Sequence, residues 1–147
     1  MKKILFTGGS GRFAKVFKQF HHNKFIIDYP TKKKFNIEKL ENVINYLRKS
    51  KPKYLIHCAA LSRPMNIHER NITKSISTNI IGTANIVKAC AKFKIKLIYF
   101  STNYVYPGKK GNYSENDALL PINNYAISKL GGECSVQLYK NSLILRI

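Results

Sequence analysis

The amino-acid sequence predicts an α/β fold, a doubly wound and mostly parallel sheet with helices on both faces. Short apolar runs of strand length alternate along the 147 residues with stretches whose apolar residues recur at helical spacing. The residues least typical of strands and helices follow those apolar runs, at positions 8–11, 28, 58–60 and 101–103. Because right-handed crossovers bring the carboxyl ends of parallel strands to one edge, these residues are expected to meet there.

The first half of the chain contains three of the expected strands and two helices. Residues 4–6 are interpreted as a buried strand, and the apolar residues at 13, 16, 17 and 20 predict a helix after it. Residues 25–27 form a second strand that ends at Asp28. Apolar residues at 40, 43, 44 and 47 mark a helix that stops before Pro52, and residues 54–56 form a strand that leads into positions 57–60.

The second half of the chain continues the alternation. A long helix is expected to carry the apolar residues at 72, 76, 80, 84 and 87 on one face. Residues 97–100 form the next strand and lead into a polar loop. A further helix is expected to begin near Pro121, whose fixed φ suits a first helical turn, and residues 143–145 form a last strand.

The length of the chain supports one domain, which we assign to residues 1–147. No apolar run approaches the roughly 20 residues that cross a bilayer, and the apolar stretch after Lys3 is too short for a signal peptide. We therefore expect a cytoplasmic protein without membrane association. Cys58, Cys90 and Cys134 lie in apolar stretches and are odd in number, so they are expected to be reduced, packed thiols, and no metal site is predicted.

The formal net charge is +19, so the surface attracts anions. Nucleic acid, anionic lipid and phosphorylated substrates are all partners that such a charge favours. The alternative is a compositional bias, because the chain is rich in Lys, Ile and Asn together. Apart from residues 32–34 and 109–110 the lysines are scattered along the sequence, which favours solvated lysines and argues against a specific nucleic-acid site.

Residues 7–14, which read TGGSGRFA, join the first strand to the first helix. Gly8 permits a turn closed to other residues, and Gly11 lets a pyrophosphate approach the helix N-terminus, where free N–H groups and the helix dipole favour negative charge. Ala14 is small enough for the helix to pack closely on the strand. The loop predicts a dinucleotide-binding Rossmann domain, although a tight turn without a ligand is the alternative. The residues expected at the cofactor here are Gly8, Ser10, Gly11, Arg12 and Phe13.

Asp28 ends the second strand, 20 residues after Gly8. An acid at this place accepts hydrogen bonds from the adenosine ribose hydroxyls and favours NAD. Arg12 and the lysines from Lys32 onward could instead hold the additional phosphate of NADP, and Asp28 could simply open the turn before Pro30. The sequence leans slightly to NAD and leaves NADP open.

Tyr125 and Lys129 stand one helical turn apart and share a helix face. A nearby ammonium and an oxidised nicotinamide would favour the phenolate and lower the tyrosine pKa from its ordinary value near ~10. Tyr125 could then exchange a proton with a substrate oxygen while hydride moves to or from the cofactor. Thr102, just past the strand 97–100, is placed to bond the same oxygen. A surface Tyr and Lys without function is the alternative.

Three further stretches bring the chain close to a known family. Residues 99–108 read YFSTNYVYPG, residues 111–113 read GNY, and residues 124–133 read NYAISKLGGE. With the glycine loop, they resemble the extended short-chain dehydrogenase/reductases, and within them the dTDP-4-dehydrorhamnose reductase (RmlD-like) group. The resemblance implies Thr102, Tyr125 and Lys129 as the catalytic triad, with Tyr125 and Lys129 also at the cofactor, where the lysine contacts the nicotinamide ribose. It also implies Asn79 as a fourth, structural member, a role compatible with a helix residue that bonds neighbouring backbone.

The chain departs from the family pattern in two places near the expected cofactor. Residues 57–60 read HCAA, where Cys58, Ala59 and Ala60 keep the small side chains that let a cofactor lie close. His57 is expected to pack near the strand end, without a catalytic role. The acid often found near the family's third strand is here Asn36, followed by Ile37, so adenine is expected to meet a side-chain amide or backbone at these two residues.

The resemblance implies an NAD(P)-dependent oxidoreductase that transfers hydride to a 4-keto nucleotide sugar, with Tyr125 as general acid. An epimerase or dehydratase of nucleotide sugars would use the same residues, and a non-catalytic, dinucleotide-binding regulatory module would keep the fold. Family members continue well beyond this length, so we expect the C-terminal substrate domain to be largely missing. The long helices offer a surface through which a homodimer could form.

Overall fold

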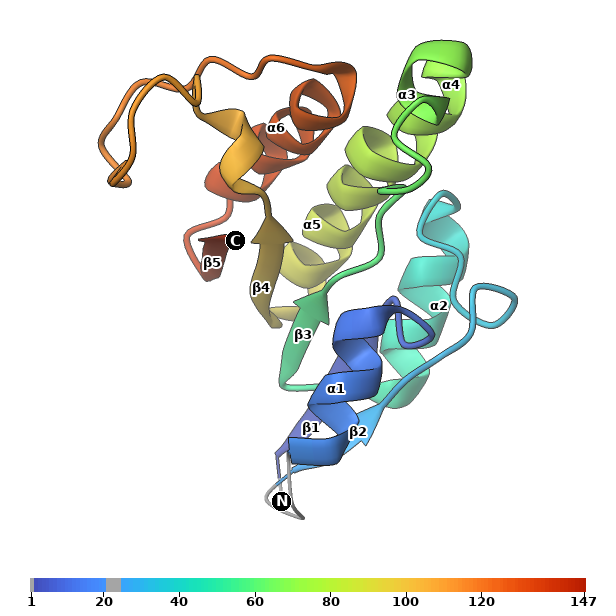
Figure 1. The fold of residues 1–147 in the computed structure, drawn as a ribbon. Helices are drawn as coiled ribbons and strands as arrows, with labels where there is room; N and C mark the ends of the chain where they lie inside the picture. The colour runs from blue at the N-terminus through green and yellow to red at the C-terminus, as the bar shows by residue number, and fades with distance from the viewer. Residues whose placement is uncertain (1, 21–24) are drawn as a thin grey trace.

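The computed structural model describes residues 2–20 and 25–147, and places five strands in one parallel sheet (Figure 1). The order across the sheet is β2-β1-β3-β4-β5, and every neighbouring pair is parallel. The expected strands are all present, with bounds that differ by a few residues. They are β1 (Lys3–Thr7), β2 (Ile26–Asp28), β3 (Tyr54–His57), β4 (Lys96–Ser101) and β5 (Ser142–Arg146).

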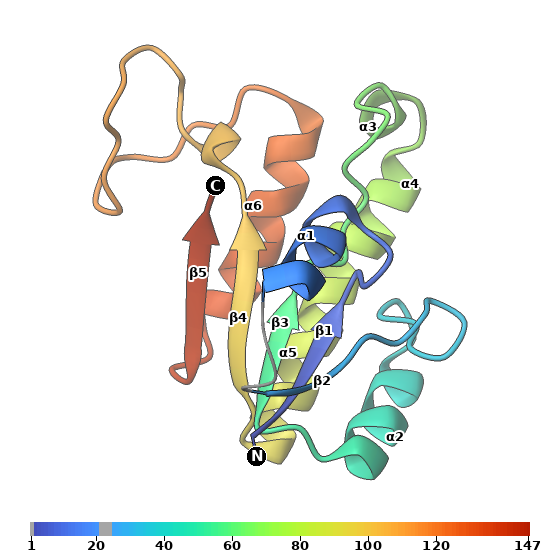
Figure 2. The same ribbon diagram turned by 60° about the horizontal axis from the view of Figure 1, so that its bottom comes forward.

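Helices cover both faces of the sheet, but unequally. On one face, α2 (Leu40–Ser50), α5 (Gly82–Phe93) and α6 (Asn124–Gln137) lie side by side, whereas α1 (Arg12–Phe20) packs on the other face (Figures 1 and 2). The doubly wound α/β fold predicted from the sequence is therefore confirmed.

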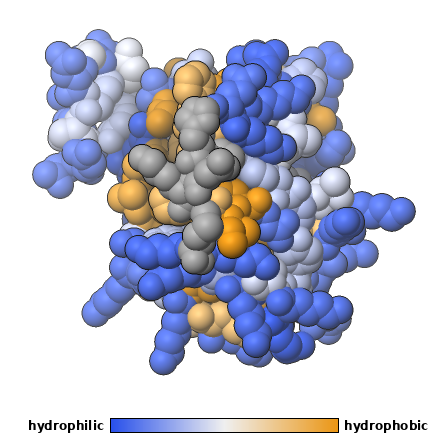
Figure 3. All heavy atoms as spheres, turned by 90° about the horizontal axis from the view of Figure 1, so that it is seen from below, coloured by the Kyte–Doolittle hydropathy of each residue, from blue (hydrophilic) through white to orange (hydrophobic). Residues whose placement is uncertain are grey.

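Two clusters of buried residues hold these layers together. The larger one lies between the sheet and helices α2, α5 and α6, and includes Leu55, Leu97, Tyr99 and Ile86, whose exposed fractions are 0%. The smaller one lies under α1 and is centred on Phe6. Apolar side chains of α1 remain exposed, and Figure 3 shows apolar surface among long polar side chains at the end of the molecule near the N-terminus.

The long helix predicted over residues 72–87 is present but is not uniform. It consists of α4 (Ile72–Ser75), a π-helical turn η1 (Ile76–Ile81) and α5. A one-turn helix, α3 (Ile67–Arg70), precedes it and was not predicted. π-Helical turns inside α-helices recur at functional sites, and this one contains Asn79.

Helix α6 begins three residues later than Pro121 suggested. The side-chain oxygen of Asn123 accepts a hydrogen bond from the Ala126 backbone N–H at 2.8 Å, so Asn123 caps the helix. Tyr125 consequently lies in the first turn of α6. A 3₁₀ turn, η2 (Asn103–Val105), follows β4.

The three cysteines are free thiols, but they are not all packed. Cys90 is buried and Cys58 is half-buried, whereas Cys134 is exposed, so the expectation of packing was wrong for Cys134. Of the helices in the described ranges, none has the length and apolar character needed to cross a membrane.

Candidate active site

The glycine loop between β1 and α1 has a backbone that only glycine suits at its first turn. Gly8 has a φ of +74°, and a Cβ there would come within 2.9 Å of the Ala59 backbone nitrogen. The Gly11 backbone N–H donates to the Gly8 carbonyl at 2.8 Å, which closes the turn. A Cβ on Gly11 would lie 3.1 Å from that same carbonyl oxygen. The loop is therefore held close to the segment after β3, and α1 starts directly from it.

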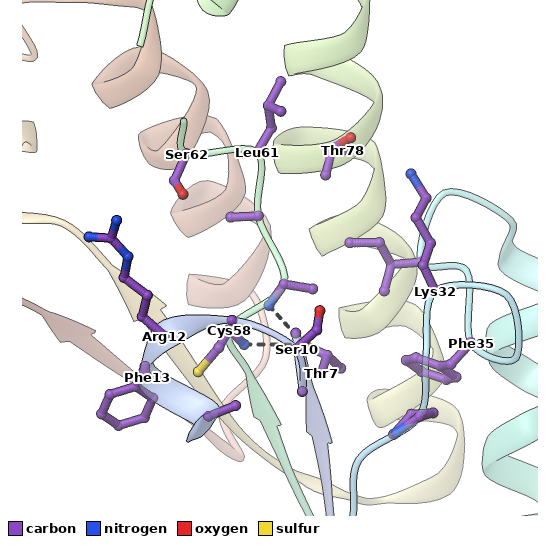
Figure 4. A pocket seen from close by; sticks show the side chains of 18 of the residues that line it. Thr7, Ser10, Arg12, Phe13, Lys32, Phe35, Cys58, Leu61, Ser62 and Thr78 are labelled. Atoms are coloured by element: carbon purple, nitrogen blue, oxygen red, sulfur yellow. Dashed lines mark hydrogen bonds between the residues drawn. The ribbon is translucent and has the colours of Figure 1, made fainter. Parts of the chain in front are cut away.

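A pocket of about 690 Å³ opens along this loop (Figure 4). Arg12 and Phe13 lie on one side of it, Lys32 and Phe35 on the other, and Ser10 lies between them. Its size is within the range of small-molecule and cofactor sites. It places the N-terminus of α1, which favours negative charge, against a wall with both apolar and basic side chains.

Most of the residues predicted for cofactor binding line this pocket. Those on its wall are Gly8, Ser10, Gly11, Arg12, Phe13, Ile37, Cys58, Ala59 and Ala60. Thr7, Gly9 and Ala14 of the predicted loop also line it, as does Lys32, the alternative for the additional phosphate of NADP. The residues that only the tertiary structure adds are Pro30, Phe35, Glu38, Leu61, Ser62, Arg63, Lys74 and Thr78. Of the predicted cofactor residues, those that are not among the described residues lining the pocket are Asp28, Asn36, Tyr125 and Lys129.

Asp28 is engaged elsewhere. Its carboxylate accepts a hydrogen bond from the Tyr46 hydroxyl at 2.8 Å, and burial together with this carboxylate raises the pKa of Tyr46 to about 12. Asp28 therefore has a hydrogen-bond partner within the protein, and its contact with the adenosine ribose stays a prediction. Asn36 is also used within the protein, because its amide oxygen accepts from the Glu38 backbone N–H at 3.1 Å.

The floor of the pocket is organised by Thr7 and His57. The Thr7 hydroxyl oxygen accepts from the backbone N–H groups of Cys58 and Ala59, at 3.1 and 3.0 Å (Figure 4). Its own proton can then be given to Nδ1 of His57, 2.8 Å away, which leaves Nε2 to donate to Thr83 at 3.1 Å. His57 is fully buried, and desolvation followed by the charge of Lys129 lowers its pKa to about 3. His57 is thus a neutral, structural side chain, as expected.

Tyr125 and Thr102 come together at the carboxyl edge of the sheet, although they are far apart in the sequence. Burial raises the pKa of the Tyr125 phenol, whereas a hydrogen bond with the Thr102 side chain lowers it. Tyr104 raises this pKa further, and the cation that lowers it is Arg63, a pocket residue. The charge of Arg63, which lines the pocket, therefore also influences Tyr125, an effect that the sequence did not reveal.

Lys129 is on the same helix but is directed toward the sheet. It is 3% exposed, its Nζ donates to the Phe100 carbonyl at 2.7 Å, and it lies 4.2 Å from the centre of the Tyr99 ring. Burial lowers its pKa to about 8, partly offset by Cys58 and Glu133. In this arrangement burial is the largest influence on the Tyr125 pKa and raises it, and the effect of Lys129 beside an oxidised nicotinamide stays a prediction.

Asn79 ties the loop after β3 to α6. Its amide nitrogen donates to the Leu61 carbonyl at 2.9 Å and to the Ser128 hydroxyl at 2.8 Å, while its amide oxygen accepts from the Leu61 N–H at 2.8 Å. Gly132 lets the two helices approach, since a Cβ there would lie 2.8 Å from the Asn79 carbonyl. These contacts fit the structural role predicted for Asn79.

Solved structures with this arrangement include two bacterial reductases. The dTDP-4-dehydrorhamnose reductase of Bacillus anthracis in complex with NADP is 29% identical, with a TM-score of 0.91 over 99% of this chain and 53% of its own. The reductase of Yersinia enterocolitica is 31% identical, with a TM-score of 0.88 over 99% of this chain and 52% of its own. The chain thus spans about half the length of these enzymes.

Curated relatives are more varied. Methionine adenosyltransferase 2 subunit beta of Danio rerio is 33% identical over an alignment of 141 residues that covers 90% of this chain and 42% of that protein. The dTDP-D-glucose 4,6-dehydratase of Dictyostelium discoideum is 30% identical over 184 residues, covering 100% of this chain and 42% of that protein. The family model described as "RmlD substrate binding domain" matches residues 1–147. Over its whole length, this chain therefore belongs to the RmlD substrate binding domain family, and it has the fold of nucleotide-sugar reductases and epimerases.

Proposed function

We propose that this chain is the dinucleotide-binding part of a nucleotide-sugar oxidoreductase that reduces a 4-keto sugar, with Tyr125 as the general acid. One observation carries the proposal. The pocket that begins at the Gly8–Gly11 turn extends along the segment after β3 to Leu61, and Asn79 bonds both Leu61 and the Ser128 hydroxyl of α6, the helix that carries Tyr125. A dinucleotide in the pocket would therefore bring its reactive end toward a phenol and a hydroxyl.

The residues present fit a nicotinamide dinucleotide. Gly8 lets the loop lie against the Ala59 backbone, where a Cβ would come within 2.9 Å, and the first residues of α1, Arg12 and Phe13, line the pocket. When bound, the nicotinamide supplies or accepts the hydride. Tyr125, kept protonated by burial, would donate its proton to the substrate oxygen, and Thr102 would orient that oxygen. Lys129, with a pKa of about 8, is well suited to bond a ribose hydroxyl after leaving the Phe100 carbonyl.

The positions of Lys32 and Asp28 favour NADP as the cofactor, whereas the sequence alone favoured NAD. Lys32 lines the pocket and pairs with Glu38 at 2.9 Å, whereas Asp28 lies outside the wall and is bonded to Tyr46. We expect Lys32→Ala to weaken NADP binding more than NAD binding, because the additional phosphate loses a cation. Asp28→Ala should leave the ratio of the two affinities unchanged. Calorimetric titration with both cofactors measures this, and a loss confined to NAD in Asp28→Ala would restore the NAD assignment.

The catalytic assignment needs a substrate-binding half. We would join residues 1–147 to the C-terminal half of the Bacillus anthracis reductase and follow nicotinamide absorbance with a dTDP-4-keto sugar. Tyr125→Phe keeps the ring and removes only the hydroxyl, so the rate should fall by roughly 10²–10⁴, the effect of losing a general acid. Tyr54→Phe, at the amino end of β3 and so at the opposite edge of the sheet from Tyr125, serves as the matched control. Equal turnover of Tyr125→Phe and the parent would refute the assignment.

Two other functions have specific support. A nucleotide-sugar dehydratase or epimerase is favoured by the identity with the Dictyostelium dehydratase, and a non-catalytic dinucleotide-binding module by the identity with the adenosyltransferase beta subunit. Cofactor binding with no turnover of any 4-keto or 4-hydroxy nucleotide sugar would favour the module. Four further points stay predictions: a nucleotide-sugar substrate, a cytoplasmic location, the absence of a specific nucleic-acid partner, and a homodimer through the long helices.

A further inference from the structure

His68 is a buried polar side chain that the proposed chemistry does not use. It lies in the one-turn helix α3, and only 1% of its surface is exposed. Burial lowers the pKa of its imidazole, partly offset by the Glu69 carboxylate, so the ring is mainly neutral at pH 7. Burying a polar ring costs free energy unless its contacts compensate. The contacts of His68 should therefore explain why this side chain is buried.

Hydrogen bonding accounts for only one of the two ring nitrogens. Nδ1 of His68 lies 2.7 Å from the Ser75 hydroxyl, which is also buried and ends α4. Nε2 has no partner among the residues that the structure describes. The hydrogen bond with Ser75 thus joins α3 to α4, but it satisfies only one ring nitrogen and does not account for the burial of the rest of the imidazole.

The imidazole packs against the phenol ring of Tyr125. The two ring centres are 5.2 Å apart and the planes are inclined by 55°, within the range of favourable aromatic contacts. A second ring, that of Tyr104, meets Tyr125 edge-on with a centre distance of 6.4 Å and an angle of 88°. The Tyr125 ring is therefore contacted by two other rings.

The backbone next to Tyr125 is tied to the same short helix. The side-chain amide of Asn124 donates to the His68 carbonyl at 3.4 Å and also to the Glu69 carboxylate. Lys129, the residue expected to accompany Tyr125, is instead directed at the Phe100 carbonyl. In this arrangement α3 holds the first turn of α6 and the phenol it carries.

We propose that His68 is a positioning residue for Tyr125, whose neutral ring packs on the phenol and keeps its hydroxyl directed toward Thr102. The proposal rests on the proposed role of Tyr125 as proton donor. It assigns a reason for burying an imidazole at this place, because a flat side chain there both restrains the phenol and shields it from water. The flat ring, and not the hydrogen bond to Ser75, carries this role.

The test measures the Tyr125 pKa in this chain by ¹³C NMR of tyrosine labelled at Cζ, with Tyr125→Phe to assign the resonance. In His68→Gln the ring is lost while a polar group remains near Ser75. Water then reaches the phenol, and we expect its pKa to fall by roughly half a unit or more toward its ordinary value. His68→Phe retains a flat ring and should keep the parent value. Ser75→Ala, the matched control, should also keep it.

The proposal is overturned if His68→Gln leaves the Tyr125 pKa unchanged, or if His68→Phe moves it as far as His68→Gln does. Nuclear Overhauser contacts between the imidazole and phenol protons of the parent chain are a second test, which needs no variant to fold, and their absence would also overturn it. Neither readout depends on turnover. Failure of the general-acid assignment would appear only as undiminished activity of Tyr125→Phe.

Discussion

Arg146, the last residue of β5, forms an ion pair with Glu133 of α6 in which the two groups are 2.8 Å apart and the Glu133 side chain is fully buried. Nε of Arg146 also lies 3.2 Å from both carboxylate oxygens, and Nη1 donates to the Tyr106 hydroxyl at 2.8 Å. The pair joins the last strand to the helix that carries Tyr125 and Lys129.

We therefore expect Arg146→Met to destabilise the fold by about 3–5 kcal/mol, because it leaves a buried carboxylate without its cation. Urea unfolding measures this. Lys110 and Asp117 form an exposed pair at 3.2 Å, and Lys110→Met should cost no more than about 1 kcal/mol. A loss in Arg146→Met as small as that of Lys110→Met would contradict the expectation. Adding Glu133→Gln to Arg146→Met should recover part of the stability.

Stability should fall in acid because of His57. Its pKa is about 3 in the folded protein against 6.5 ordinarily, so between these values the unfolded chain binds the proton and the folded chain does not. The free energy of unfolding therefore rises with pH across this window, by up to about 1.4 kcal/mol per pH unit, and the stabilisation is lost as pH falls from about 6.5 to 3. Unfolding curves from pH 7 to 4 measure the slope. His57→Asn should show a shallower slope, and equal slopes would exclude His57 as the cause.

Two lysines end helices in a backbone conformation that suits glycine. Lys51 after α2 has a φ of 45°, and Lys94 after α5 a φ of 57°. Replacing either with glycine should stabilise the protein by roughly 0.5–1 kcal/mol, because a side chain is strained at positive φ. Lys53→Gly, at an exposed position without positive φ, is the control and should give no gain. Melting temperatures that do not rise in either variant would show that the strain is negligible.

Cofactor binding should depend on Gly11. In Gly11→Val the added side chain would crowd the Gly8 carbonyl and occupy the approach of a pyrophosphate, so calorimetry should detect no NAD or NADP binding. Gly111→Val is a matched control, because a Cβ at that glycine meets nothing within 4 Å. Undiminished affinity in Gly11→Val would place the cofactor somewhere other than the glycine loop.

The formal net charge of +19 attracts nucleic acid through charge alone, and no sequence preference follows from it. We expect weak binding of DNA that fades as salt rises through ~0.15 M and is indifferent to sequence. Gel-shift titrations at several salt concentrations measure this. A clear preference for one sequence would show a specific site.

Local patterns in the sequence determined much of this protein. Each strand could be predicted because a buried parallel strand needs a short apolar run, and α1 because apolar residues at positions 13, 16, 17 and 20 make one face of a helix. The glycine loop was equally visible, since the φ of Gly8 and the close approach to Ala59 require a glycine. The proposed catalytic residues Thr102 and Tyr125 were named from motifs, and in the structure the Thr102 side chain acts on the Tyr125 phenol and lowers its pKa.

Only the tertiary structure decided how individual side chains are used. Asp28 bonds to Tyr46, Lys129 reaches the Phe100 carbonyl, and His68 packs on Tyr125, and each of these partners lies at least 18 residues away in the sequence. No local pattern predicts such pairs, because they depend on the order of the strands and the direction in which each helix returns. The sequence by itself determined which groups reach the carboxyl edge of the sheet. Which of them meet there was decided by packing, since a buried polar group takes whichever partner the fold brings within hydrogen-bonding distance.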